Sequence, residues 1–429
     1  MIGLDDLLDI TVGLGVLAFL IAGMVLRSKR PKTPLWSLMA FTAFVVVMAG
    51  LVPLETIAEA IDMDVVLFLI GMFSIVAVAE SSGLLDWVAH FVVSRFKRTH
   101  SVLVFLSLTM GFLSAIAVND TVALMGPPIV YSLARSMDID PRPAFLLLAF
   151  SITIGSTTTP IGNPQNMLIA ISSGMRAPFI DFVKYLVVPT VINLVVTALI
   201  VIKFYGIKNE VLQRTGERRY INNARDAIVA FALLVAVIGS LVANDLMALS
   251  GLPHVEHRGF IPFIIAAGGY LLVSNPRDVL RRVDWGTIVF FMAMFITMEG
   301  VWKSGVLNPL LSFLMPHKNA WPLDYFGILL CSLLMSQLLS NVPFTKLFLD
   351  YMKSLGYSPS DVDSWVTLAM ASTIAGNLTI LGAASNVIIL EVLEARYGRT
   401  ISFTEFLKVG VVVTAVNIAI YTAFLLFLA

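Results

Sequence analysis

The feature that most constrains the fold is a long uncharged stretch with a polar centre. From Pro143 to Met175 there is no charged residue, although about 20 apolar residues suffice for a membrane-spanning helix. The centre nevertheless contains a run of threonines and the segment Gly162–Asn166, which reads Gly-Asn-Pro-Gln-Asn. Helix-breaking residues at membrane depth are tolerated only where they are buried in protein or line a cavity. The stretch therefore predicts a broken membrane helix beside a polar binding site.

The composition is that of a polytopic membrane protein. Hydrophobic residues make up 58% of the 429 residues, charged residues make up 13%, and the mean hydropathy is +0.90. Soluble domains carry about 25% charged residues. The formal net charge is zero, which indicates no nucleic-acid partner. We expect a protein of the plasma (inner) membrane that meets the lipid bilayer and a small solute, with a homodimer left open.

Two other apolar segments are interrupted by polar residues near their centres. Ser101–Ala134 is interrupted by Asn119-Asp120, and Tyr325–Leu349 is interrupted at Ser340–Pro343. Each half of these segments is too short for a comfortable span. They are typical of re-entrant hairpins, in which the chain turns back near the middle of the membrane.

Basic residues gather in alternate connections between the apolar segments. If these connections are cytoplasmic, as the positive-inside rule requires, every uninterrupted segment crosses the membrane once. The first hairpin then enters from the cytoplasm, the second enters from outside, and both termini lie outside. The basic residues concerned include Arg27, Lys29, Arg95, Lys97, Arg135, Arg142, Lys203, Lys208, Arg277, Arg281, Arg282, Arg396 and Arg399.

The two halves of the chain repeat each other at their polar interruptions. At one offset Asn119 corresponds to Asn341, and at a nearly equal offset Gly162 corresponds to Gly382. The equivalents are separated by an odd number of crossings, so the repeats are inverted in the membrane, as in many secondary transporters.

These patterns predict an all-α integral membrane protein with about ten transmembrane helices, two opposed re-entrant hairpins and two broken helices. The first inverted repeat is residues 1–215, with a hairpin at 101–134 and a broken helix at 143–175. The second is residues 216–429, with a hairpin at 325–356 and a broken helix at 364–395.

The residues at the breaks resemble those of a known superfamily. Thr159–Asn166 resembles the Thr-Pro-Ile-Gly-x-Pro-x-Asn element of the ion transporter superfamily, which includes divalent anion/sodium symporters, citrate–metal transporters, arsenite efflux pumps and a class of sodium/proton antiporters. Ala117–Leu124 is similar to the arsenite-pump and antiporter branches, where Asn-Asp occurs at the first hairpin tip. Superfamily tips typically read Ser-Asn-Thr, whereas here they read Val-Asn-Asp and Ser-Asn-Val, so the threonines of two ordinary sodium sites are missing.

The resemblance implies an elevator-type carrier with a coupling site and a substrate site between the tips. Coupling to Na⁺ or H⁺ would involve Asn119, Asp120, Gly162, Asn341 and Gly382. The substrate would meet Thr121, Thr159, Asn163, Asn166, Ser340, Lys346, Ser385 and Asn386. No cofactor and no resident metal site are expected. A phosphate-binding loop with Lys-Ser/Thr is missing from the sequence, so we expect no ATPase in this chain.

Two charged residues admit alternative interpretations. Asp120 lies at a hairpin tip, and a carboxylate inside the membrane is a functional candidate by default; it could instead cap a helix that starts at Thr121. Lys346 could replace a second cation or contact an anionic substrate. Alternatively, it could reach the surface or pair with Asp350 four residues later.

The predicted function is a secondary active transporter for a small inorganic or organic anion, or for a metalloid oxyacid such as arsenite, coupled to Na⁺ or H⁺. The alternative is a sodium/proton antiporter that uses Asp120. A passive anion channel is a third interpretation, but a channel does not need two inverted hairpins with closed tips. An enzyme is not expected, because no nucleophile–base arrangement is found in the sequence.

Overall fold

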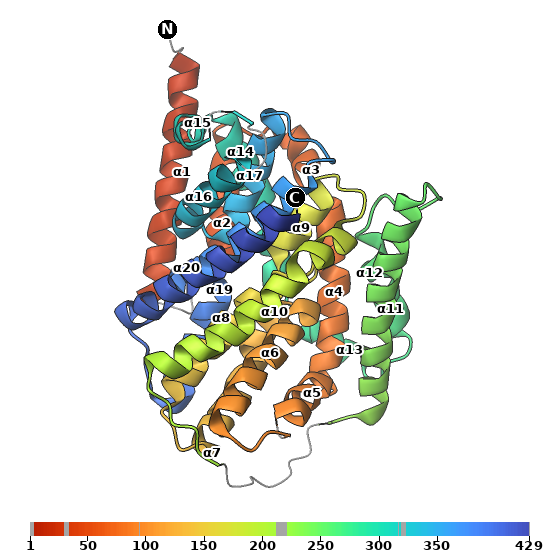
Figure 1. The fold of residues 1–429 in the computed structure, drawn as a ribbon. Coiled ribbons are helices and arrows are strands. Elements are labelled where there is room, and N and C mark those ends of the chain that lie inside the picture. The colour runs from red at the N-terminus through yellow and green to blue at the C-terminus, as the bar shows by residue number, and fades with distance from the viewer. Residues whose placement is uncertain are drawn as a thin grey trace.

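The structure is a computed structural model that describes residues 4–29, 34–93, 95–211, 221–315, 317–318 and 323–428. Within these ranges the chain is helical apart from its connections, and it forms no strand (Figure 1). The predicted all-α membrane fold is therefore confirmed. The predicted boundary between residues 215 and 216 lies outside the described residues.

The first half of the chain runs from two peripheral helices to a hairpin, a broken helix and a long diagonal helix. Its elements are α1 Leu4–Lys29, α2 Leu35–Met48, η1 Leu54–Thr56, α3 Ile57–Ala60, α4 Met63–Ser81, α5 Leu84–Val93, α6 Thr99–Ala117, α7 Asn119–Ser136, α8 Pro141–Ser156, α9 Pro164–Ser172 and α10 Pro178–Phe204.

The second half follows the same order. Its elements are α11 Ala224–Leu249, α12 Phe260–Tyr270, α13 Pro276–Arg282, α14 Trp285–Lys303, α15 Asn308–Leu314, α16 Leu323–Leu339, α17 Asn341–Ser354, α18 Val362–Ile374, η2 Ala375–Asn377, η3 Ile380–Gly382, α19 Ala384–Tyr397 and α20 Phe403–Leu428.

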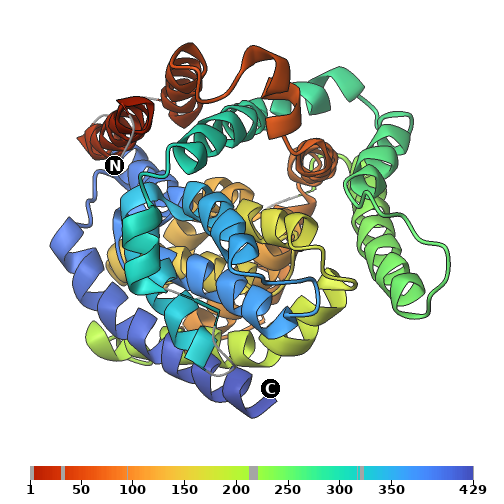
Figure 2. The same ribbon diagram turned by 90° about the horizontal axis from the view of Figure 1, so that it is seen from above.

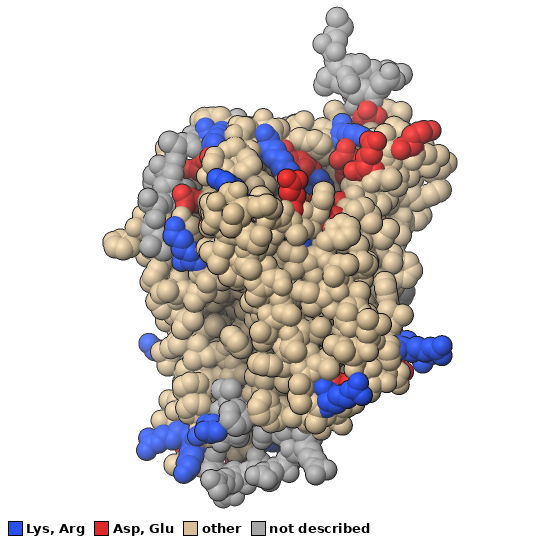
Figure 3. Space-filling view, turned by 90° about the vertical axis from the view of Figure 1, so that its right-hand side faces the viewer, with Lys and Arg blue, Asp and Glu red and all other residues tan. Residues whose placement is uncertain are grey.

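The described helices carry the apolar surface that a bilayer requires. Six of them are long and apolar enough to cross a membrane, and shorter apolar helices accompany them. Figure 3 shows charged side chains at both ends of the molecule and an almost uncharged band between them. Long apolar side chains such as Phe41, Phe44 and Ile228 are exposed, as expected where lipid is the solvent.

The two hairpins enter the molecule from opposite ends. In Figure 1, α6 and α7 rise from the lower end, whereas α16 and α17 descend from the upper end. Each hairpin turns at one residue with positive φ, which is Val118 (φ 63°) in the first and Ser340 (φ 69°) in the second. This conformation is rare for residues with a side chain, so its occurrence at both equivalent positions supports the internal repeat at the hairpin tips.

The broken helices lie in the middle of the molecule. In the first, α8 ends at Ser156 and α9 begins at Pro164; in the second, α18 ends at Ile374 and α19 begins at Ala384. Seen from above, these helices lie centrally, while α1 and α2 lie at one edge and α11 and α12 stand out at another (Figure 2). The fold therefore encloses both helix breaks within protein.

The long helices α10 and α20 cross each other where the two halves meet. The Asn417 side-chain amide donates to Asn193 Oδ1 at 3.0 Å and to the Thr197 hydroxyl at 3.2 Å. The Tyr421 and Thr190 hydroxyls lie 2.6 Å apart. All of these groups are buried, so each half provides hydrogen-bond partners for buried polar groups of the other half.

One long apolar run is divided in the structure. Val65–Val93 contains 29 residues with few charges, and it separates into α4 and α5 at Gly83, whose φ is +81°. Gly305 has a φ of +66° after α14 in the second half. Glycine is favoured at a helix end that requires a left-handed residue.

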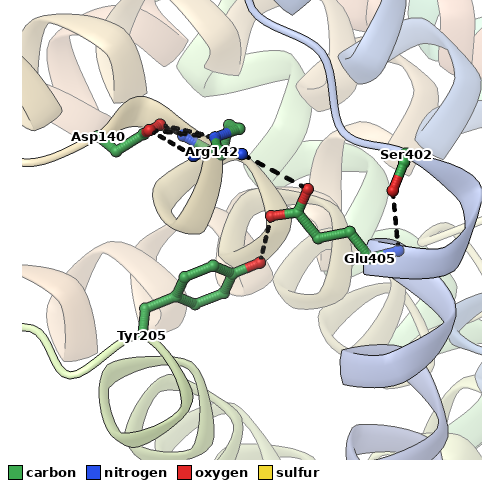
Figure 4. Close-up of polar contacts among 5 residues, drawn as sticks. All are labelled: Asp140, Arg142, Tyr205, Ser402 and Glu405. Carbon is green, nitrogen blue, oxygen red and sulfur yellow. Dashed lines mark hydrogen bonds and ion pairs between the residues drawn. The ribbon is translucent and has the colours of Figure 1, made fainter.

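Two of the basic connections meet at the lower end of the molecule in Figure 1. The connection before α6 lies against the one after α10, where the Thr99 amide donates to the Glu210 carbonyl at 3.0 Å. In Figure 4, Arg142 lies between two carboxylates, with 2.8 Å to Asp140 and 3.7 Å to Glu405. The Tyr205 hydroxyl donates to Glu405 at 2.8 Å. This network joins the start of α8 to the end of α10 and the start of α20.

From the Asp140–Arg142 contact we expect the folded protein to lose a little stability in acid. The hydrogen bond from Arg142 lowers the pKa of the Asp140 carboxyl. Because the pKa of Asp140 is lower in the folded state than in the unfolded state, its ionised form stabilises the folded protein at pH values above the unfolded pKa of about 4. This stabilisation is lost as the pH falls through the pKa of the folded state. Because Asp140 is partly exposed, the effect is at most about 1 kcal/mol. Thermal unfolding of Asp140→Asn should depend less on pH between about pH 5 and pH 2; an unchanged pH slope would contradict this assignment.

Candidate functional site

Both hairpin tips and both broken helices meet at one cavity. Its volume is about 470 Å³, and it is bounded by α2, α4, α7, α9, α13, α14, α17 and α19. Its mouth lies toward the end where the basic connections meet, because Trp36, Arg282 and Asp284 at the rim are exposed. The polar residues that line it are Glu80, Asn119, Asp120, Thr121, Gln165, Arg282, Asp284, Thr287, Ser340 and Asn341.

The first tip is attached to the first broken helix through the backbone. The Asn119 amide donates to the Gly162 carbonyl at 2.9 Å. The Asn119 side chain is 6% exposed, and its Oδ1 atom accepts no hydrogen bond. A buried carbonyl-type oxygen without a donor is costly, and it is a suitable ligand for a hard cation.

The second tip repeats this arrangement. Asn341 is 5% exposed, and its Oδ1 atom also accepts no hydrogen bond. Its amide nitrogen lies close to Gly376 in the second break, where an added Cβ would approach it to 3.2 Å. The two equivalent asparagines thus present unpaired oxygens from opposite ends.

The polar side chains of the first break hold its backbone together. Asn163 caps α9, because its side-chain oxygen accepts from the backbone N–H of Asn166 at 2.9 Å. The side-chain NH2 group of Asn163 donates to the Ser156 carbonyl at 3.1 Å. The Asn166 side chain donates to the carbonyls of Ser156, Thr157 and Thr159 at 3.1–3.3 Å. These carbonyls are freed where α8 ends.

The second break uses the equivalent side chain in the same way. The Asn386 amide donates to the carbonyl of Gly376 at 2.8 Å and to that of Thr379 at 3.3 Å. The two breaks are also joined across the halves, because the Thr373 hydroxyl lies 3.2 Å from the Asn163 amide nitrogen and donates to Asn166 Oδ1 at 3.3 Å.

Loss of the Asn166 side-chain amide should destabilise the protein strongly. Asn166→Ala leaves buried carbonyls without a side-chain donor, and each such group costs about 1–3 kcal/mol. We expect about 2–4 kcal/mol less stability, measured by thermal unfolding in detergent. Asn222, an exposed amide that donates to the Ser81 carbonyl, is the matched control, and its replacement by Ala should change stability by less than about 0.5 kcal/mol. Equal effects of the two substitutions would show that Asn166 does not support the break.

The first break also requires a very close approach of two backbone segments. An added Cβ at Gly162 would overlap the Ser156 carbonyl oxygen and lie 2.7 Å from the Ser156 Cα atom. An added Cβ at Gly155 would overlap the backbone of Gly111 in α6. Glycine is therefore required both inside the break and where the hairpin packs on α8.

The sequence-predicted site residues fall into two groups in the structure. Asn119, Asp120, Thr121, Ser340 and Asn341 line the cavity. The others are not among its lining residues: Gly162, Gly382, Thr159, Asn163, Asn166, Ser385, Asn386 and Lys346. Thr159 donates to the Ala115 carbonyl, and Ser385 is buried with an unpartnered hydroxyl. The binding roles of both groups stay predictions.

Of the two charged residues with alternative interpretations, Lys346 forms the predicted ion pair and Asp120 does not form the predicted helix cap. Lys346 Nζ lies 2.7 Å from Asp350 Oδ2, with both side chains mostly buried. Asp120 does not cap its helix, because α7 begins at Asn119 and Val118 occupies the capping position. Asp120 instead lies in the first turn, where a carboxylate meets the positive end of the helix dipole.

Five polar lining residues were not predicted as site residues: Glu80, Gln165, Arg282, Asp284 and Thr287. Glu80 lies at the end of α4. Arg282 was counted only among the basic connections, and Gln165 was quoted only as part of the motif. Gln165 lies in the first turn of α9, is 4% exposed and lines the cavity. Its place directly after Pro164, at the start of a half-helix, is the signal that could have identified it.

The cavity offers separate environments for anions and cations. The first turns of α9 and α19 line it through Pro164, Gln165 and Ala384, and helix N-termini stabilise negative charge. The unpaired amide oxygens of Asn119 and Asn341 suit a cation. Among the described residues, no group of three or more His, Cys, Asp or Glu side chains could hold a metal ion.

Inverted repeats, opposed hairpins and two broken helices around one central cavity define a membrane transporter. The family model described as "Citrate transporter" matches residues 12–375. The chain therefore belongs to the citrate transporter family, and the resemblance to the ion transporter superfamily is confirmed.

Individual proteins agree with this assignment. An uncharacterized transporter of Mycobacterium tuberculosis is 28% identical over 379 residues, which cover 85% of this chain and 86% of that protein. The human P protein is 23% identical, over 96% of this chain and 58% of that protein. The crystal structure of the YdaH transporter of Alcanivorax borkumensis matches 86% of each chain, with a TM-score of 0.53 and 13% sequence identity. The last match shows a shared fold.

Proposed function

We propose that this protein is a secondary active transporter that moves a small anion, or a metalloid oxyacid such as arsenite, together with Na⁺ or H⁺. The observation that carries the proposal is the meeting of two hairpin tips and two half-helix N-termini at one cavity. The half-helix N-termini would hold the anion, and the tip asparagines Asn119 and Asn341 would hold the coupling cation. Membership of the citrate transporter family supports a small organic anion among the candidates.

The proposed mechanism is of the elevator type. The hairpins and broken helices would move as one body against a scaffold that includes α4 and α14, because the cavity separates α7 and α19 from these helices. The proposal includes a location in the plasma membrane, with the basic connections in the cytoplasm. The cavity would then face the cytoplasm, and both termini would lie outside.

A specific observation favours a second function, sodium/proton antiport. Among the described residues that line the cavity, Glu80, Asp120 and Asp284 are acidic, whereas Arg282 is the single basic residue. An excess of carboxylates attracts cations and can carry protons. Asp120 would be the exchanging group, because it lies at the tip beside the unpaired oxygen of Asn119.

Purified protein in liposomes distinguishes these functions. Uptake of citrate, phosphate, sulfate, a dicarboxylate and arsenite should be measured under a Na⁺ or pH gradient. Saturable uptake of one of these solutes, stimulated by either gradient, is the expected result. Movement of Na⁺ against a proton gradient without any of the solutes would establish antiport instead. A flux that neither saturates nor shows counterflow would indicate a channel.

A further inference from the structure

The side chain of Asn377, in the second helix break, is a buried polar group without a partner. It belongs to η2 and is 0% exposed, and neither its Oδ1 nor its Nδ2 atom bonds to any residue that the structure describes. Two further unpaired atoms belong to α20, namely Thr414 Oγ1 and Asn417 Oδ1, and both residues are buried. Buried polar groups are normally hydrogen-bonded, so these three side chains require an explanation.

The three side chains meet at one face of α20. Gly410, Thr414 and Asn417 share this face because they follow one another at helical spacing. An added Cβ at Gly410 would overlap the Asn377 carbonyl oxygen, so η2 packs directly on the same face. Side chains lean toward the N-terminus of their helix, and that of Thr414 therefore leans toward the turn where Asn377 lies. One turn further on, the Asn417 amide donates to the Thr197 hydroxyl of α10 at 3.2 Å.

The counterpart of Thr414 in the first repeat has a partner. Thr190 occupies the same place in α10 as Thr414 does in α20, and its hydroxyl lies 2.6 Å from that of Tyr421. The Tyr421 hydroxyl also contacts Thr157 at the end of α8. A phenol from α20 therefore joins α10 to the first helix break.

The second repeat has no phenol at the equivalent place. Tyr421 corresponds to Thr197 in α10, and Thr157 corresponds to Asn377 at the offset that relates the two breaks. A threonine side chain is shorter than a tyrosine by an aromatic ring, and Thr414 Oγ1 is accordingly left unpaired within the described part of the chain. Unpaired polar atoms thus border the place that the phenol takes in the first repeat.

We propose that this place binds a monovalent alkali cation such as Na⁺. The oxygen ligands would be supplied by the side chains of Asn377, Thr414, Asn417 and Thr197. Amide and hydroxyl oxygens are suitable ligands for hard cations. The site goes beyond the proposed function, because it lies behind the second break and none of its four residues lines the transport cavity.

The surroundings of Asn377 favour a cation over an anion. Asn377 lies just beyond the end of α18 at Ile374, and the carbonyl groups at a helix C-terminus carry partial negative charge. Half-helix C-termini coordinate Na⁺ in secondary transporters. The four ligand residues include no carboxylate, whereas sites for Ca²⁺ and Mg²⁺ use carboxylates, so the ion is monovalent. A water molecule on the ion would accept from the side-chain NH2 group of Asn377.

Thermal unfolding of the full chain in detergent tests the site without any solute. NaCl is exchanged for N-methyl-D-glucamine chloride at constant ionic strength, and KCl is used in a parallel series. We expect Na⁺ or K⁺ to raise the unfolding temperature saturably, because a ligand that binds only the folded state stabilises it. An unfolding temperature that does not depend on the cation would overturn the proposal, since water alone would then satisfy Asn377.

Thr414→Val locates the cation. The substitution removes one oxygen ligand and keeps the shape of the side chain, so the cation concentration for half-maximal stabilisation should rise about fivefold or more. Thr190→Val, at the counterpart whose hydroxyl meets Tyr421, is the matched control and should leave this concentration unchanged. Thr414→Ser, which keeps the hydroxyl, should also leave it unchanged. Equal shifts in the two valine variants, or no shift in Thr414→Val, would contradict the site.

Thr197→Tyr provides a second variant in case Thr414→Val does not fold. It copies the first repeat, in which a phenol meets the threonine of the facing helix. We expect the response to alkali cations to disappear, with an unfolding temperature in N-methyl-D-glucamine at least equal to that of the unmodified protein. A full response to Na⁺ or K⁺ in folded Thr197→Tyr protein would overturn the proposal.

Asn341→Ala separates this site from the coupling cation of the proposed function. The substitution removes the unpaired oxygen at the second hairpin tip, and the effect of Thr414→Val should persist in this background. If the effect disappears, the cation is bound at the tip and the second site is refuted. If the effect persists in a protein that transports none of the tested solutes in liposomes, the proposed function fails and the cation site stands.

Discussion

Asp120→Asn should reduce gradient-driven accumulation to the level of liposomes without protein. The substitution keeps the size of the side chain but removes the charge and the exchangeable proton at the first hairpin tip. Asp120 lines the cavity beside Asn119, and an intramembrane carboxylate in such a place is a functional candidate by default; we propose it as the coupling group. Solute exchange between equal concentrations should persist, because exchange needs no net movement of the coupling ion. Both quantities can be measured in the same liposomes.

The matched control for this prediction is Glu80→Gln. Glu80 lines the same cavity but extends from the end of α4, on the wall opposite the tips. We expect Glu80→Gln to retain accumulation, with altered affinity at most. Accumulation by Asp120→Asn at the level of the unmodified protein would remove Asp120 from the coupling role. Loss in Glu80→Gln alone would transfer that role to Glu80.

Gly162→Ala should prevent the protein from folding stably. The new methyl group would overlap the Ser156 carbonyl oxygen, and the contacted atoms belong to the backbone of the same break. Backbone cannot move aside as a flexible side chain can, so the cost exceeds the usual range of about 1–3 kcal/mol for overpacking. The expected result is little monodisperse protein on size-exclusion chromatography after extraction in detergent.

The internal repeat supplies a graded control for this substitution. At Gly382 an added Cβ would lie 3.0 Å from the Ala375 carbonyl oxygen, so Gly382→Ala should be tolerated better than Gly162→Ala. Gly239 in α11 has no heavy atom within 4 Å of an added Cβ, and Gly239→Ala should leave the yield unchanged. A stable Gly162→Ala protein would mean that the close approach of the two segments is not required.

The fold could be predicted from the sequence because membrane burial makes polar interruptions conspicuous. Asn119 and Asn341 interrupt apolar segments, and the structure places a turn directly before each of them. The predicted hairpin at 101–134 corresponds to α6 and α7, whose outer limits are Thr99 and Ser136. The division at Gly83 was not predicted, because both α4 and α5 are apolar.

The site could be predicted only in part, because two kinds of polar residue look alike in sequence. Freed carbonyls at a helix break must be satisfied, and Asn163 and Asn166 do this through contacts within the break. Thr121, by contrast, lines the cavity. Arg282 reaches the same cavity from a connection far along the chain, and such proximity depends on packing that no local pattern contains.

The crossing of α10 and α20 also bears on the symmetry between the two halves of the chain. Asn193 and Asn417 occupy matching places in Thr-x-x-Asn sequences of the two helices, and each amide nitrogen contacts the other residue. In an isologous dimer, a residue near the two-fold axis meets its own copy. The pair therefore has the form of a contact on a two-fold axis, at which one residue type serves both sides.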